Sequence, residues 1–133
     1  MTDLELIEQA KSALRHSYSP YSHFCVGAAL LTKNGTVYTG CNVENAAFGP
    51  SICAERTAFC KAVSVGERDF AAIAIVGGKE GVITDYCPPC GVCRQVMSEF
   101  CQGDFKIILS DGHGGLKVRT LDEMLPERFG LNE

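Results

Sequence analysis

Four of the eight cysteines in this 133-residue chain stand beside proline, glycine or charged residues: Cys53, Cys87, Cys90 and Cys93. Cys90 and Cys93 have the Cys-x-x-Cys spacing of paired metal ligands, and Cys53 adds a third thiolate. Four thiolates would close a tetrahedral zinc site, whereas three leave one position for water, which is the catalytic arrangement. Glu55 follows Cys53 by two residues, so its carboxylate could take a proton from that water.

The same residues allow other interpretations. A single Cys-x-x-Cys pair is weak evidence, and a fourth thiolate from Cys87 would make the zinc site closed and structural. A dithiol redox protein would also use such a pair, but Cys53 and Glu55 would then have no part in its chemistry. Glu55 could also be a solvated carboxylate that stabilises the start of a helix.

Two expected helices position these groups. The apolar spacing predicts a helix over 52–64, with Cys53 in its first turn, and a helix over 90–101, with Cys90 and Cys93 in its first turn. A helix N-terminus carries about +0.5 of an elementary charge, which stabilises thiolates. Because each helix follows a strand and loop of one sheet, the two N-termini can converge.

The rest of the chain is expected to alternate between helices and strands. We expect helices over 3–16 and 121–125, and strands over 25–32, 36–41, 70–76, 105–110 and 116–119. Asp3 and Ser51 are placed to cap the first two helices, and Asn34-Gly35 predicts a hairpin turn. The turn over 111–115 is too short for a parallel crossover, so the last two strands should be antiparallel. This order predicts an α/β fold, a three-layer α/β/α sandwich with a five-stranded mixed sheet.

Composition narrows the class of protein. The length predicts a single domain over residues 1–133. A formal charge of −4 argues against a nucleic-acid partner, and the longest apolar run, over 24–31, is too short to cross a membrane. The acidic N-terminal segment does not resemble a signal or transit peptide. We therefore expect a cytoplasmic protein whose cysteines are free thiols or metal ligands, because a reducing compartment disfavours disulfides.

Two segments, CAERTA over 53–58 and PCGVCRQ over 89–95, resemble the paired zinc motif of cytidine deaminases. Further segments resemble the substrate side and the C-terminal end of the same family, namely 24–30, 41–46, 125–126 and 129–130. The resemblance covers almost the whole chain. It is to the short, homotetrameric branch that acts on nucleosides, in which the first zinc ligand is Cys instead of His.

The resemblance implies zinc-dependent hydrolytic deamination of cytidine and 2′-deoxycytidine to the uracil nucleosides, with release of ammonia, as in pyrimidine salvage. Cys53, Cys90 and Cys93 would hold one Zn²⁺ per subunit. A zinc-activated water would attack C4 of the pyrimidine, and Glu55 would carry protons to N3 and then to the leaving amino group.

Substrate-binding roles also follow only from the resemblance. Asn42 and Glu44 match positions that hydrogen-bond the ribose hydroxyls, with Val43 between them. Phe24 matches a ring that packs against the base, although a phenylalanine before a strand is also typical of a core. Ala54 would offer a backbone group to the base.

Four more positions concern assembly and the charge of the site. Phe129 matches the C-terminal aromatic residue that a neighbouring subunit supplies to the pocket, and Phe48 stands where tyrosine is usual, which makes that contact between subunits apolar. Arg56 matches a position that hydrogen-bonds the ligand sulfurs, and Arg94, next to Cys93, could act in the same way. Either arginine could instead be exposed on its helix.

The nearest alternative function is a deaminase that acts on another aminopyrimidine or on a blasticidin-type antibiotic. The segment Asn-Val-Glu-Asn over 42–45 favours a nucleoside, because it matches the ribose-binding segment of the family. A non-enzymatic zinc module is the second alternative, and it would need Cys87 as a fourth ligand.

Overall fold

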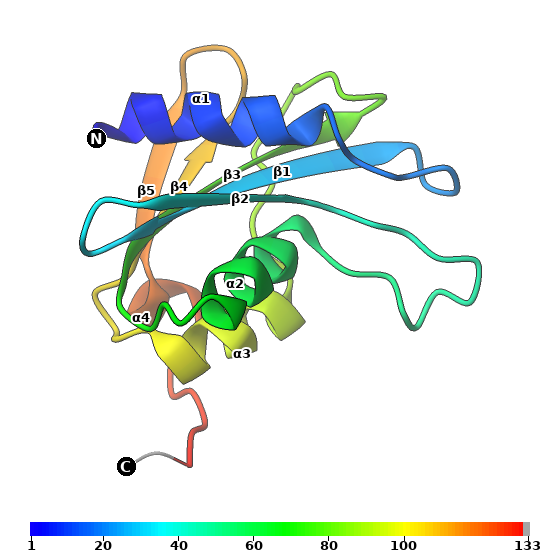
Figure 1. Cartoon of the computed structure of the whole chain (residues 1–133). Coiled ribbons are helices and arrows are strands. Elements are labelled where there is room, and N and C mark those ends of the chain that lie inside the picture. Colours follow the sequence, from blue (N-terminus) through cyan, green and yellow to red (C-terminus); the bar gives the residue numbers. More distant parts are fainter. Residues whose placement is uncertain (132–133) are drawn as a thin grey trace.

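The computed structural model describes residues 1–131 and has one five-stranded sheet with helices on both faces (Figure 1). The strands lie in the order β2-β1-β3-β4-β5. Their bounds are β1 (Phe24–Thr32), β2 (Val37–Cys41), β3 (Phe70–Lys79), β4 (Lys106–Ser110) and β5 (Leu116–Thr120). The β3–β4 pair is parallel, and the β1–β2, β1–β3 and β4–β5 pairs are antiparallel. This confirms the predicted α/β sandwich with a mixed sheet.

Helix α1 (Asp3–Leu14) covers one face of the sheet, and α2 (Ala54–Ser64), α3 (Gly91–Phe100) and α4 (Leu121–Met124) lie on the other (Figure 1). The apolar side chains of α1 pack on small residues of β1 and β3, in a cluster that includes Leu6, Ile7, Ala10, Ala29 and Ala74. In residues 1–131 no helix has the length and apolar content needed to span a membrane.

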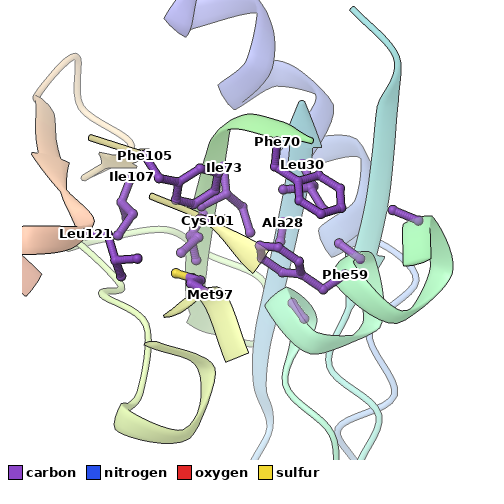
Figure 2. Packing of buried hydrophobic residues seen from close by; sticks show 14 of the residues in the cluster. Ala28, Leu30, Phe59, Phe70, Ile73, Met97, Cys101, Phe105, Ile107 and Leu121 are labelled. Atoms are coloured by element: carbon purple, nitrogen blue, oxygen red, sulfur yellow. The ribbon is translucent and has the colours of Figure 1, made fainter. Parts of the chain in front are cut away.

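The second core lies between the sheet and α2, α3 and α4, and Phe59 is central to it (Figure 2). Its ring is 5.1 Å from that of Phe70, 6.1 Å from that of Phe100 and 6.2 Å from that of Phe105. Met97 of α3 is fully buried in the same cluster. This core therefore joins α2 to α3, the two helices that carry the cysteine motifs.

Both expected N-caps are wrong. Thr2 caps α1 by accepting a hydrogen bond from the Glu5 N–H, and Asp3 instead pairs with Lys106 at 2.9 Å. Ser51 does not cap α2, whose N-cap residue is Cys53, and its hydroxyl instead accepts a hydrogen bond from the Asn45 N–H at 3.0 Å.

The start of α2 is delayed by a contact with a distant segment. Val43 and Ile52 exchange two backbone hydrogen bonds of 2.9 Å, which hold residue 52 in an extended bridge. The helix therefore begins at Ala54, with Cys53 as its N-cap residue, and not at residue 52. The hairpin prediction is confirmed, since the Thr32 N–H donates to the Thr36 carbonyl around the Asn34-Gly35 turn.

Candidate metal centre and active site

Three sulfur atoms converge where α2 and α3 begin. Cys53 and Cys90 are the N-cap residues of the two helices and make no capping hydrogen bond with their side chains, and Cys93 lies in the first turn of α3. Cys53 Sγ and Cys90 Sγ are 3.7 Å apart, and all three sulfur atoms lie within 4.8 Å of one another. Zn²⁺ holds tetrahedral sulfur ligands about 3.8 Å apart, since a Zn–S bond is about 2.3 Å. The cluster therefore fits zinc.

Hydrogen bonding in the cluster favours a thiolate at Cys53. The Cys93 thiol and the Arg56 guanidinium, whose Nη2 is 3.6 Å from Cys53 Sγ, lower the pKa of Cys53 to about 5. Cys93 donates the hydrogen bond, which together with burial raises its pKa well above the usual range. Zn²⁺ would replace that proton, because a coordinating thiol is deprotonated.

Arg56 adds a cation beside this cluster. Its Nε atom is buried and has no hydrogen-bond partner among the described residues. A buried cationic donor is costly unless negative charge lies nearby. Three thiolates and one Zn²⁺ sum to a charge of −1, so the guanidinium is placed to balance the metal centre.

Glu55 is the buried acid of the site. Glu55 lies in the first turn of α2 and is only 4% exposed to solvent. Burial raises the pKa of its carboxyl to about 7, because the charged form loses its solvation. A carboxyl that titrates near neutral pH can both accept and release a proton, as a general acid-base group must.

A cavity of about 350 Å³ opens beside the cluster. It is walled by residues of β1, the segment after β2, the start of α2 and the segment before α3. The structure brings seven of the candidate residues to this wall: Asn42, Glu44, Cys53, Ala54, Glu55, Arg56 and Cys90. Cys93 lies behind the wall and is 1% exposed. The volume is at the lower end of that of small-molecule sites, which are about 300–1,000 Å³.

Five residues of the cavity wall were not expected to line it: Val26, Ser51, Ile52, Cys87 and Pro88. Val26 could have been found, because it lies two residues after Phe24 and alternate residues of a strand share one face. Cys87 was considered only as a ligand, and among the described residues it does not belong to the sulfur cluster.

A family model described as the cytidine and deoxycytidylate deaminase zinc-binding region matches residues 1–109, which include the three cysteines of the sulfur cluster. The chain belongs to this family. The zinc-binding region thus contains the Cys53, Cys90 and Cys93 triad, and the predicted family and cofactor are confirmed.

Relatives match over nearly the full length. A cytidine deaminase of Sporosarcina psychrophila is 48% identical over 129 residues, which cover 97% of this chain and 92% of that protein. The crystal structure of a cytidine deaminase from Burkholderia pseudomallei has 46% identity and a TM-score of 0.89, with 97% of this chain and 100% of that chain covered. A blasticidin-S deaminase of Bacillus cereus is 32% identical over 134 residues, which cover 98% of this chain and 94% of that protein.

The remaining candidates in this deaminase-family chain lie around the cavity or away from it. Phe24 begins β1 and is 40% exposed. The Phe24 ring and the Cys87 sulfur both lie beside Gly77. Because Cys87 lines the cavity, the ring lies near the edge of the cavity. Val43 is half-exposed, and its backbone bridge to Ile52 holds the segment with Asn42 and Glu44 against the start of α2.

Two aromatic candidates do not line the cavity of their own chain. Phe48 is 72% exposed in the loop before α2 and makes an edge contact with Tyr21 at 6.2 Å. Phe129 is 67% exposed, and Gln95 of α3 donates a hydrogen bond to its carbonyl at 3.1 Å. It lines a separate cavity of about 510 Å³ beside the end of α3.

The two candidate arginines have different partners. Arg94 donates hydrogen bonds to the carbonyls of Pro89 at 2.8 Å and Met124 at 2.7 Å. These contacts brace the residue before Cys90 and tie α3 to α4. Arg56, by contrast, contacts a sulfur directly.

Proposed function

We propose that this chain catalyses the zinc-dependent hydrolysis of cytidine and 2′-deoxycytidine, a step of pyrimidine salvage. One water is consumed, and the products are uridine or 2′-deoxyuridine and ammonia. The observation that carries the proposal is the position of Glu55, a buried carboxyl beside three converging thiolates at the wall of a nucleoside-sized cavity. The cytidine deaminases at 48% and 46% identity support the same reaction.

Cys53, Cys90 and Cys93 hold the metal in this proposal. When bound, Zn²⁺ supplies Lewis acidity and lowers the pKa of water. Arg56 offsets the negative charge of the thiolates, which would otherwise weaken that effect. These three cysteines would be the only protein ligands, which is the ligand number of catalytic zinc sites.

Glu55 moves the protons. Its carboxylate accepts a proton from the water that attacks C4 and delivers it to N3 of the pyrimidine. It then takes the remaining proton from the new C4 hydroxyl and delivers it to the 4-amino group, so that the C4–N bond breaks, the C4 carbonyl forms and ammonia leaves. Its low exposure shields these protons from bulk water, and its raised pKa suits both transfers.

The nucleoside is held by residues around the same cavity. Asn42 and Glu44 hydrogen-bond the ribose hydroxyls, and the polar side chains at the cavity wall support this role. Phe24 packs against the base, and the backbone of Ala54, at the start of α2, hydrogen-bonds it. Val43 holds the two ribose-binding residues in place through its bridge to Ile52.

The proposed assembly is a homotetramer with pockets shared between subunits. Phe48 and Phe129 are large, exposed and absent from the cavity of their own chain, so each is free to reach the pocket of a neighbour. We place the protein in the cytoplasm, because three cysteines are proposed zinc ligands and the other five are thiols outside any disulfide, a state that a reducing compartment maintains.

Conversion of cytidine and 2′-deoxycytidine by the purified protein, followed by loss of ultraviolet absorbance, tests the function, with zinc measured on the same sample. Blasticidin S is the specific alternative, because one relative at 32% identity is a blasticidin-S deaminase. Faster conversion of blasticidin S than of cytidine would favour that function. Bound zinc with no conversion of any substrate would indicate a structural zinc module.

A further inference from the structure

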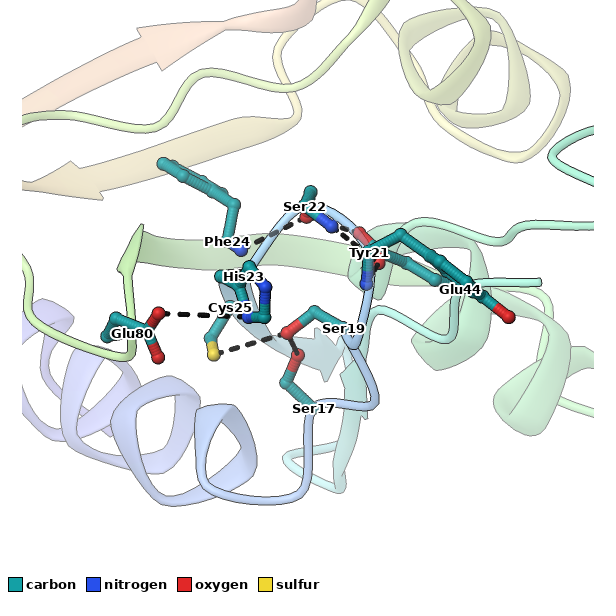
Figure 3. Close-up of polar contacts among 9 residues, drawn as sticks. All are labelled: Ser17, Ser19, Tyr21, Ser22, His23, Phe24, Cys25, Glu44 and Glu80. Atoms are coloured by element: carbon teal, nitrogen blue, oxygen red, sulfur yellow. Dashed lines mark hydrogen bonds and ion pairs between the residues drawn. The ribbon is translucent and has the colours of Figure 1, made fainter. Parts of the chain in front are cut away.

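The loop before β1 contacts both side chains that are proposed to bind the ribose, Glu44 through Tyr21 and Ser22 (Figure 3) and Asn42 through Ser17. The Tyr21 and Ser22 N–H groups donate to Glu44 Oε1 at 3.0 and 3.1 Å. The Ser22 hydroxyl donates to Glu44 Oε2. Both carboxylate oxygens of Glu44 are therefore held before any substrate is present, by a segment 22 residues earlier in the chain.

Asn42 is held in a similar way. Its Oδ1 accepts hydrogen bonds from the Val26 N–H at 3.0 Å and the Ser17 hydroxyl at 2.5 Å, and its Nδ2 donates to the Phe24 carbonyl at 2.8 Å. A flipped amide would direct its NH₂ group at the Val26 N–H, so only one orientation is favourable. Among residues 1–131 the other N–H of the amide has no partner, so it can donate to a ligand.

Ser17 and Ser22 do not line the cavity, whereas Asn42 and Glu44 do. The serines would therefore affect a ligand through the residues that they contact and not by touching it. A side chain that is already fixed loses less rotamer freedom when a ligand binds, which strengthens binding without a new contact.

We propose that Ser17 and Ser22 are positioning residues for nucleoside binding: they fix the Asn42 amide and the Glu44 carboxylate in the orientation that receives the ribose hydroxyls. This inference rests on the proposed deaminase function. It assigns the two serines no contact with substrate and no part in the proton transfers.

The test is steady-state kinetics of the zinc-loaded enzyme with two substrates, cytidine and 2′,3′-dideoxycytidine, which lacks the 2′ and 3′ hydroxyls. Ser22→Ala and Ser17→Ala should each raise the KM for cytidine about three- to ten-fold and leave kcat within about two-fold. Neither should change kcat/KM for dideoxycytidine. Ser22→Thr keeps the hydroxyl and should restore most of the wild-type KM.

Ser64→Ala is the matched control, because Ser64 is exposed at the far end of α2 and its hydroxyl donates to the Lys61 carbonyl. It should leave both substrates unaffected. The second substrate also separates a competing role, since the Ser22 hydroxyl accepts a hydrogen bond from the Phe24 N–H at 3.0 Å. An equal loss with both substrates would mean that Ser22 acts through Phe24 or through the fold, and would overturn the inference.

Two further outcomes are distinguishable. A wild-type enzyme that converts cytidine, with alanine variants whose KM is unchanged, would overturn the role of the serines and leave the deaminase function intact. A wild-type protein that does not convert cytidine would overturn the function, and the role of the serines with it. If Ser22→Ala fails to fold, Ser17→Ala decides the question alone.

Discussion

A methyl group on Gly40 of β2 would lie 2.5 Å from the carbonyl oxygen of Ala54, so strand and helix pack this closely only because residue 40 has no side chain. Gly40→Ala should push the start of α2, with Cys53 and Glu55, away from the sheet. We expect a loss of about 1–3 kcal/mol in the free energy of unfolding, as for overpacked cores, together with weaker zinc binding. Urea denaturation and a competitive zinc chelator measure the two effects.

Gly91→Ala is the control for this substitution. Gly91 lies between two zinc ligands, but a methyl group there would meet nothing within 4 Å. Stability and zinc affinity should stay at wild-type values. A Gly40→Ala protein that behaves like Gly91→Ala would show that the packing of β2 on α2 does not position the site.

Glu55→Gln should keep about one zinc per chain and lose kcat by about two to four orders of magnitude, because the amide is similar in size but cannot carry protons. Metal analysis and single-turnover rates measure this. Glu8→Gln, on the exposed side of α1, is a control that should keep full activity. Near-normal turnover in Glu55→Gln would reject the proposed proton transfer.

Cys87→Ser should keep zinc and most activity, whereas Cys53→Ala, Cys90→Ala and Cys93→Ala should each lose both. Cys87 is outside the sulfur cluster, and burial raises its pKa to about 12, so it remains a thiol. The two prolines at 88–89 also favour an extended path that carries it away from Cys90. Zinc lost from Cys87→Ser but kept in Cys53→Ala would mean that the wrong three thiolates were chosen.

Phe129→Ala should raise the KM for cytidine if this side chain completes the pocket of a neighbour. Mixing it with Glu55→Gln should restore part of the activity, because an intact aromatic residue and an intact acid can then meet across the interface. Val65→Ala, at a residue of equal exposure on another surface, should not affect KM. A fully active monomer at the assay concentration would contradict the shared pocket.

The Glu44 carboxyl should titrate below its ordinary range. Hydrogen bonds from the Ser22 hydroxyl and the Ser22 N–H lower its pKa, with smaller effects from Tyr21 and His23. The stabilisation of the ionised form is thus present above the ordinary pKa and is lost as pH falls through the lowered one. Ser22→Ala should raise this pKa toward the ordinary value, which a ¹³C NMR titration with Glu44→Gln for assignment measures. An unchanged pKa would show that the backbone donors suffice.

The zinc ligands and the acid could be predicted because their signals are local. Cys90 and Cys93 are three residues apart at a helix start, and Glu55 follows Cys53 by two, so residue type and spacing nearly determine which groups share one end of a helix. The five strands were found for the same reason, since their apolar runs and the Asn34-Gly35 turn are short-range patterns.

Tertiary contacts decided the rest. Arg56 and Arg94 look alike in sequence, since each is close to a zinc ligand. Arg56 contacts the sulfur of Cys53, whereas Arg94 donates to carbonyls of α4 and of the loop before α3. This difference depends on how the helices pack and cannot be predicted from the sequence. The backbone bridge between Val43 and Ile52 keeps residue 52 extended, so α2 begins at Ala54 and not at the predicted residue 52.

The hydrogen bond from the Ser22 hydroxyl to the Glu44 carboxylate likewise joins residues that are 22 positions apart in the chain. The sequence by itself determined which groups of this protein can bind zinc and move protons, because residue types and their spacing are local properties of the chain. Only the tertiary structure decided how those groups are oriented and held, because hydrogen bonds between distant segments form only once the sheet and helices have packed.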